Sequence, residues 1–140
     1  MDATDAWKSL SDTTRKLIKA VGLEVSKAGV SLVEVKTMHL LQREGRMPMT
    51  RVAYELMLTP AGATMVADRL ERRGFIRRAR SPDDRRIVYV ELTRRGSDKL
   101  RLAMNFHNSY MERLFSGLTH SEIKSLITVL SKIDSLMGPV

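Results

Sequence analysis

A short helix with clear ends in the middle of the sequence constrains the fold most. Thr59 and Pro60 match a helix start, because a threonine oxygen can accept from the first free backbone N–H groups and proline has no N–H to leave unpaired. Apolar residues then recur at helical spacing up to Gly74, which ends the pattern. A second short helix is expected at 49–57, so the two predict a helix-turn-helix.

The stretch behind this helix has the composition of a basic hairpin. Residues 75–80 and 86–92 are rich in β-branched and aromatic side chains, and the Ser-Pro-Asp-Asp sequence at 81–84 is typical of a turn. Arginines lie at its base and at its tip. A basic hairpin directly after a helix-turn-helix predicts the wing of a winged helix, formed by residues 31–97.

Long helices are expected on both sides of this lobe. Ser31 and Glu34 form a capping-box pattern at the start of a helix, and a serine or threonine followed three residues later by glutamate recurs at Thr119. Helices are expected over 4–27 and 94–116, and an apolar stripe follows in 123–137. The chain is therefore predicted to be one mainly α domain, residues 1–140, with a small β-hairpin.

Positive charge is concentrated in one part of the chain. Residues 68–101 contain twelve basic and six acidic side chains, a net +6 of the chain's +8. A localised positive field attracts a polyanion, and nucleic acid is the commonest one. A solvated charged face is the alternative that charge alone leaves open. An acidic membrane surface fits less well, because a strand-like run interrupts the cluster.

Several functional classes lack their sequence signals. The chain has no cysteine, which excludes disulfides and thiolate zinc sites, and His39, His107 and His120 do not have metal-ligand spacing. The sequence shows no recognisable pattern for a nucleophile–base pair or for a glycine-rich phosphate loop. We therefore expect no enzyme, no cofactor and no metal. Without a long uncharged apolar run or a signal peptide, no membrane partner is expected and the expected location is the cytoplasm.

The segment LTPAGATMVADRLERRGFIRRARSPDDRRIVYVELTRRG, Leu58 to Gly96, resembles the MarR family of multiple antibiotic resistance regulators. Its densest parts are DRLERRGFI, DDRR and VELTRRG. The resemblance implies a winged helix-turn-helix regulator, most simply a repressor, that binds pseudo-palindromic double-stranded DNA as a homodimer. It also implies dimerisation through the N- and C-terminal helices, residues 1–27 and 98–137, whose apolar stripe is too extensive to face water.

The helix after Thr59 is the candidate recognition helix. Its first residues would meet base edges in the major groove. Because most of them are small or apolar, we expect contacts with thymine methyl groups, a phosphate contact from Thr59 and a base contact from Arg69. The candidate DNA-binding residues of this helix are Thr59, Pro60, Ala61, Gly62, Thr64, Met65 and Arg69.

The wing supplies the remaining candidates. A carboxylate beside two arginines can fix one guanidinium, and the resemblance implies that Arg85 enters the minor groove while Asp84 orients the wing. An ordinary turn with an exposed ion pair is the alternative. We also expect Asp68 to form an ion pair with a nearby arginine. The candidate DNA-binding residues of the wing are Arg78 and Arg80, as phosphate contacts, with Asp84, Arg85 and Arg86 at the tip.

The resemblance further implies a small-molecule effector. An anionic aromatic ligand would lie between the first helix and the base of the wing, anchored by Lys16, Lys19 and Arg86. Leu32 stands where some similar proteins have a tyrosine in this ligand site.

Methionines are most often core fillers, and some can line a ligand cleft; Met38, Met57 and Met104 are among them. A winged-helix module that binds a protein or RNA partner is the alternative function. Such a module would expose apolar residues on the candidate recognition helix and would need no arginine-tipped wing.

Overall fold

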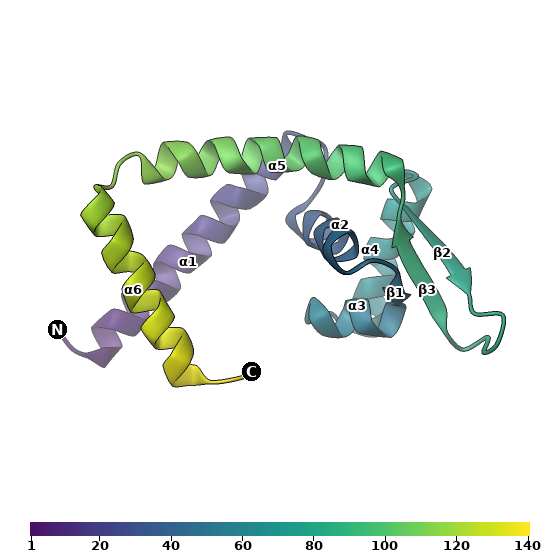
Figure 1. Cartoon of the computed structure of the whole chain (residues 1–140), viewed down its shortest axis with the longest axis horizontal. Coiled ribbons are helices and arrows are strands. Elements are labelled where there is room, and N and C mark those ends of the chain that lie inside the picture. The colour runs from purple at the N-terminus through teal and green to yellow at the C-terminus, as the bar shows by residue number, and fades with distance from the viewer. The chain divides into compact units, whose positions relative to one another are not determined.

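Six helices and three short strands follow one another along the chain (Figure 1). The computed structural model describes all residues, Met1–Val140. Two compact parts make up the chain, Met1–His107 and Asn108–Val140. The elements are α1 (Ala3–Ser26), α2 (Leu32–Glu44), β1 (Met47–Pro48), α3 (Met49–Glu55), α4 (Pro60–Arg72), β2 (Ile76–Arg80), β3 (Val88–Leu92), α5 (Arg94–Phe115) and α6 (His120–Met137).

The predicted helix starts are confirmed by their capping hydrogen bonds. The Ser31 hydroxyl accepts from the Glu34 N–H at 3.3 Å, and the Glu34 carboxylate accepts from the Ser31 N–H at 2.8 Å. Thr119 forms the same reciprocal box at the start of α6. Thr59 Oγ1 accepts from the Gly62 N–H at 3.0 Å, and Pro60 is the first residue of α4. Each box satisfies backbone donors that the helix cannot pair internally.

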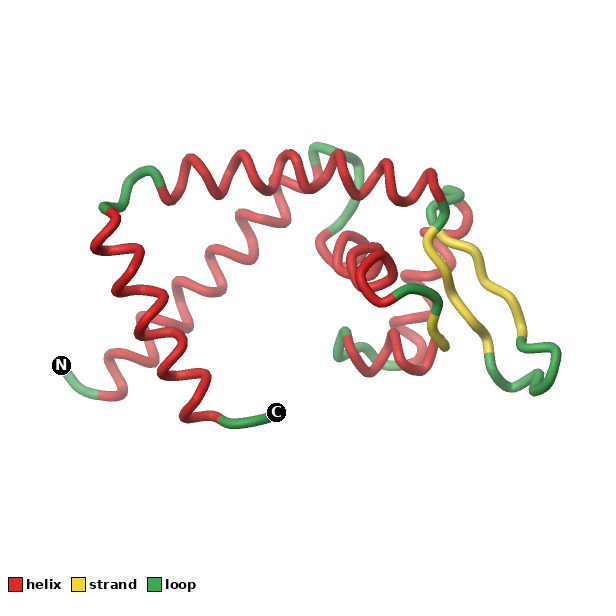
Figure 2. The backbone as a smooth tube through the Cα atoms, in the orientation of Figure 1, coloured by secondary structure: helices red, strands yellow, loops and turns green.

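The sheet has the order β1-β3-β2, drawn in yellow in Figure 2. The hairpin pairs Ile76 with Leu92, as the sequence predicts for the wing. The strand β1 was not predicted. It has only two residues and pairs Met47 with Val90, so no local periodicity announces it. Through β1, the wing is hydrogen-bonded to the segment that leads into the helix-turn-helix.

The core of residues 1–107 lies between α1, α2, α4 and the first half of α5. Val25, Met38, Leu70 and Leu100 are fully enclosed there. The start of α5 approaches the end of α4 very closely. A Cβ on Gly96 would lie 2.1 Å from the Phe75 carbonyl oxygen, so only glycine permits this contact. The start of α5 is thus packed directly against the segment that joins α4 to the wing.

The part formed by residues 108–140 has a different character. The apolar stripe predicted for α6 is present, yet α6 has no buried residue. Leu126, Ile127 and Leu130 are among its exposed large hydrophobic side chains. No helix of the chain is both long enough and apolar enough to span a membrane.

The compact parts do not coincide with the lobes expected from the sequence. The expected dimerisation lobe joined residues 1–27 to 98–137. In the structure α1 and the first half of α5 belong to the same compact part as the winged helix, because α1 packs against α2 and its Val25 enters the shared core.

Candidate nucleic-acid interface

The exposed face of α4 presents the candidate recognition residues. Ala63, Val66, Ala67 and Leu70 are buried on the inner face. The predicted contact residues lie on the other side, where Gly62 is half-buried and the rest are exposed: Thr59, Pro60, Ala61, Thr64, Met65 and Arg69. A helix with this division can place its N-terminal turn against a groove without exposing the core.

Two exposed side chains beside α4 were not among the contact residues expected from the sequence. Tyr54 in the last turn of α3 is 82% exposed, and Met57 in the turn before α4 is 93% exposed. Residue type suggested a core position for Met57, which is wrong; Met38 is a core residue, as expected, with none of its surface exposed. The one available signal for Met57 was its place within the tight turn of the helix-turn-helix.

The tip of the wing is organised by a serine and an aspartate. The hydroxyl oxygen of the buried Ser81 accepts from the backbone N–H groups of Asp83 and Asp84 at 3.2 and 3.3 Å. The Asp84 carboxylate accepts two hydrogen bonds from the Arg86 guanidinium, at 3.0 and 2.9 Å, and one from the Arg86 backbone N–H, at 3.1 Å. These bonds hold the pKa of this carboxyl below its ordinary value. The guanidinium fixed by Asp84 is therefore that of Arg86.

The side chain of Arg85, next to Arg86, takes no part in the contacts of the wing tip. Arg80 Nη1 donates to the backbone carbonyl oxygen of Arg85 at 2.8 Å, which ties the loop to the end of β2. The guanidinium of Arg85 has no partner within the chain, and its side chain is exposed. An ordered loop thus presents one unpaired cation at its tip.

Arg78 is placed differently from the other arginines of the wing. Its guanidinium donates to Asp68 at 2.6 Å and to Glu71 at 2.9 and 3.2 Å, and its backbone N–H donates to Glu71 at 3.0 Å. Hydrogen bonds from Arg78 lower the pKa of Glu71. The predicted ion pair of Asp68 with an arginine is confirmed. Because two carboxylates occupy Arg78, its expected phosphate contact competes with this network, whereas the charge of Arg80 stays uncompensated.

The basic cluster of residues 68–101 is divided by the fold. Arg73 donates to the Gly29 carbonyl oxygen at 2.7 Å and Lys99 to the Ala28 carbonyl oxygen at 2.9 Å. Both cations also lie over the Phe75 ring, 4.8 and 5.7 Å from its centroid. They sit at the C-terminal end of α4, about 20 Å from its N-terminus at 1.5 Å per residue. These cations attach the loop between α1 and α2 to the winged helix and lie away from the N-terminal end of α4.

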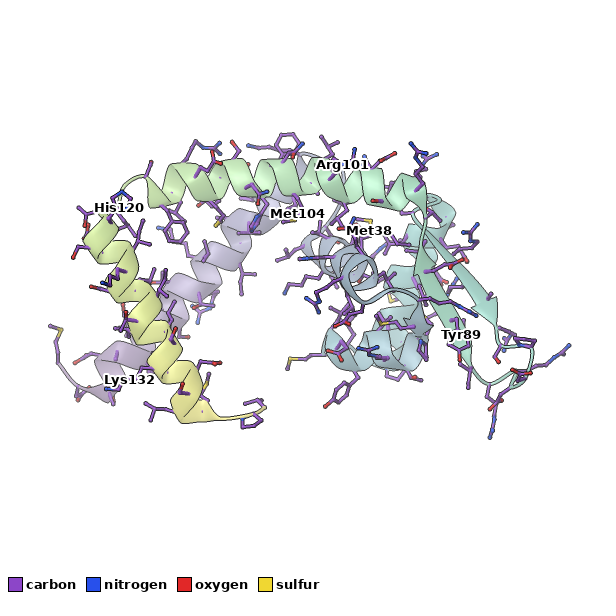
Figure 3. The ribbon with its side chains drawn as sticks, viewed as in Figure 1. Met38, Tyr89, Arg101, Met104, His120 and Lys132 are labelled. Carbon is purple, nitrogen blue, oxygen red and sulfur yellow. The ribbon has the colours of Figure 1, made fainter.

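A partly open cavity of about 340 Å³ lies between α1, α2 and α5. It is lined mainly by apolar side chains, among them Leu32 and Met104, which is labelled on α5 in Figure 3. Lys36, His39 and His107 supply its polar lining. The two histidines are 68 positions apart, so their sequence spacing gave no sign of this shared site.

The cations expected to anchor a ligand are not part of this cavity. Lys16 and Lys19 lie on α1 with exposed side chains and do not line it. Arg86 does not line this cavity either, because it lies in the loop at the wing tip and pairs there with Asp84. In the half of the wing next to its loop, the guanidinium of Arg46 lies 4.2 Å from the ring centroid of Tyr89, which pairs with Ala79 of β2.

Comparison with known proteins agrees with this geometry. The model of the MarR family matches residues 30–88. The chain is 35% identical to YkoM of Bacillus subtilis, an uncharacterized helix-turn-helix (HTH) type transcriptional regulator, over 91% of this chain and 78% of YkoM. It is 25% identical to MdtR of the same species, an HTH-type transcriptional repressor, over 93% and 84% of the two chains. The structure of FabT from Streptococcus pneumoniae in complex with DNA covers 97% of this chain and 97% of FabT, with 25% identity and a TM-score of 0.77.

Proposed function

Because this chain belongs to the MarR family, we propose that it represses transcription as a homodimer that binds a pseudo-palindromic operator. It is a DNA-binding transcriptional regulator by family and by fold. Repression is proposed because the relative MdtR is named a repressor. The alternative of a module for a protein or RNA partner is not favoured, since the wing presents an unpaired arginine.

The observation that supports DNA binding best is the pairing pattern of the wing tip. Asp84 binds the guanidinium of Arg86, and Arg80 donates to a loop carbonyl oxygen, so the guanidinium of Arg85 is the one in the tip loop that has no partner. A single cation on an ordered tip suits the narrow minor groove, where negative potential is concentrated. Meanwhile the exposed N-terminal turn of α4 enters the adjacent major groove, and Arg69 reaches a base edge.

The dimer is proposed from the exposed stripe of α6. Large apolar side chains that stay exposed in a single chain mark an interaction surface. Leu126 and Leu130 are 39% and 44% exposed, and Trp7 and Leu10 of α1 are 67% and 40% exposed. We therefore keep residues 1–27 and 98–137 as the proposed dimerisation surface.

The cavity between α1, α2 and α5 is the proposed effector site. Its lining suits an apolar acid, with Lys36 pairing with the carboxylate and the aliphatic walls enclosing the remainder. A ligand regulates DNA binding if it prefers one of two conformations, typically by ~1–3 kcal/mol. Lys36→Met should weaken ligand binding and leave DNA binding without ligand unchanged. Lys19→Met is the matched control, because Lys19 lies outside the cavity and should leave both unchanged.

Selection of bound genomic fragments tests the proposed function. The purified protein should enrich fragments that share a pseudo-palindrome whose half-sites lie about one helical turn apart, ~10 base pairs centre to centre. The same selection with added aromatic carboxylates should recover fewer fragments. A protein that enriches no DNA at physiological salt would overturn the proposal.

A further inference from the structure

The turn between α3 and α4 has a methionine where the backbone favours glycine. α3 ends in a double hydrogen bond, from the Leu58 N–H to the Ala53 carbonyl oxygen at 2.9 Å and from the Met57 N–H to the Tyr54 carbonyl oxygen at 3.2 Å. This helix ending requires a left-handed residue, and Met57 has a φ of +56°. It is the one non-glycine residue of the chain with positive φ.

The end of α4 can be compared directly with the end of α3. α4 ends in the same pair of hydrogen bonds, from Phe75 to Leu70 and from Gly74 to Glu71, both 2.9 Å. There the left-handed position, with φ of +78°, is a glycine. Residues other than glycine pay a steric cost in this conformation, because their Cβ comes too close to a backbone carbonyl oxygen.

Nothing within the fold offsets that cost at Met57. Its side chain is 93% exposed, so it gains no packing in the chain. Backbone strain that is retained without a structural benefit points to a function of the side chain. An exposed apolar side chain on a strained turn is best explained by a contact outside the chain.

The position of Met57 indicates which contact this is. Met57 lies two residues before Thr59, which caps the end of α4 that enters the major groove. Tyr54, in the last turn of α3, is 82% exposed close by in the sequence and offers a hydroxyl. Methionine has no strong donor or acceptor, and the thymine methyl is the apolar group of the major groove.

We propose that this turn reads DNA: Met57 contacts a thymine methyl group at the edge of each half-site, and the Tyr54 hydroxyl donates to a neighbouring phosphate. The inference rests on the proposed function and adds a sequence-reading residue outside the recognition helix. It predicts that each half-site of the operator contains one thymine that is recognised by Met57 and not by α4.

The test replaces Met57 by glycine and, separately, each operator thymine by deoxyuridine, which removes only the methyl group. Met57→Gly should raise the melting temperature by about 2–4 °C, because strain is relieved. It should weaken operator binding about fourfold for each half-site, the effect expected for one buried methyl group. The operator affinity of the wild type should fall by the same factor when one particular thymine is replaced by deoxyuridine. The affinity of Met57→Gly should not change with that replacement.

Two further variants complete the design. Met57→Leu keeps an apolar side chain, so it should retain both operator affinity and the sensitivity to deoxyuridine. Tyr54→Phe should weaken binding to operator and scrambled duplexes by equal factors. The inference is overturned if Met57→Gly binds the operator as tightly as wild type, or if every thymine replacement affects the two proteins equally. Failure of wild type to bind any DNA would instead overturn the proposed function.

Discussion

Arg78 on β2 donates a hydrogen bond of 2.6 Å to Asp68 on α4. Together with the bonds from Arg78 to Glu71, this contact joins the middle of β2 in the wing to α4, the candidate recognition helix. In the proposed complex these two elements enter adjacent grooves. Their relative position therefore depends on a side chain that is itself mostly shielded from solvent.

Replacement of Arg78 by methionine should disturb this joint. The two carboxylates would lose their partner, and we expect the free energy of unfolding to fall by roughly 1–2 kcal/mol. Operator binding should weaken more than binding to a scrambled duplex, because the wing is no longer aligned with α4. Urea unfolding and competition binding measure the two effects. Arg77→Met is the matched control, since Arg77 pairs only with Glu91 at the surface. Equal losses on both duplexes would identify Arg78 as a phosphate contact.

The same network predicts a dependence on pH. Hydrogen bonds from Arg78 hold the pKa of Glu71 below its ordinary value of 4.5. The stabilisation is therefore complete above pH 4.5 and is lost as pH falls through the lower folded-state pKa. Glu71→Gln should be less stable than wild type at pH 7, and the difference should vanish in acid. A difference that does not shrink as the pH falls through the acid range would exclude Glu71 as its source.

Substitution in α6 tests the proposed dimer. Leu126→Glu combined with Leu130→Glu places charge in the exposed stripe, so both dimerisation and operator binding should weaken together. Sedimentation velocity gives the oligomeric state at micromolar concentration. Lys124→Glu, on the same helix, controls for added charge alone. A wild-type protein that sediments as a monomer would contradict the dimer.

Arg69 is expected to contact a base edge. Arg69→Ala should relax the preference at one or two base pairs in each half-site, by roughly 1–3 kcal/mol if the contact is bidentate. Competition with single-base operator variants measures this change. A uniform loss across all variants would instead make Arg69 a phosphate contact.

Features set by neighbouring residues could be predicted from the sequence. Thr59 accepts from the Gly62 N–H, and Ser31 and Glu34 each accept from the other's N–H, always over three positions. The helices begin where these pairs lie. The order of helix, hairpin and helix follows from such local signals. The fold class could therefore be assigned before the tertiary contacts were known.

Features that depend on tertiary contacts could not be predicted. The strand β1 exists only because Met47 meets Val90 across the fold. Adjacent arginines look equivalent in sequence, yet Asp84 takes up Arg86 and leaves Arg85 without a partner. The exposure of Met57 depends on a turn conformation that its residue type disfavours.

Competition binding by Arg85→Ala at two salt concentrations tests the central claim most directly. If the wing tip enters the minor groove, the variant should bind operator and scrambled duplexes more weakly than wild type. The slope of log affinity against log salt should flatten by about one for each lost phosphate-neutralising contact. The loss should be largest beside A·T-rich flanks, where the minor groove is narrow. If Arg85→Ala binds both duplexes as tightly as wild type with an unchanged salt slope, the wing does not contact DNA.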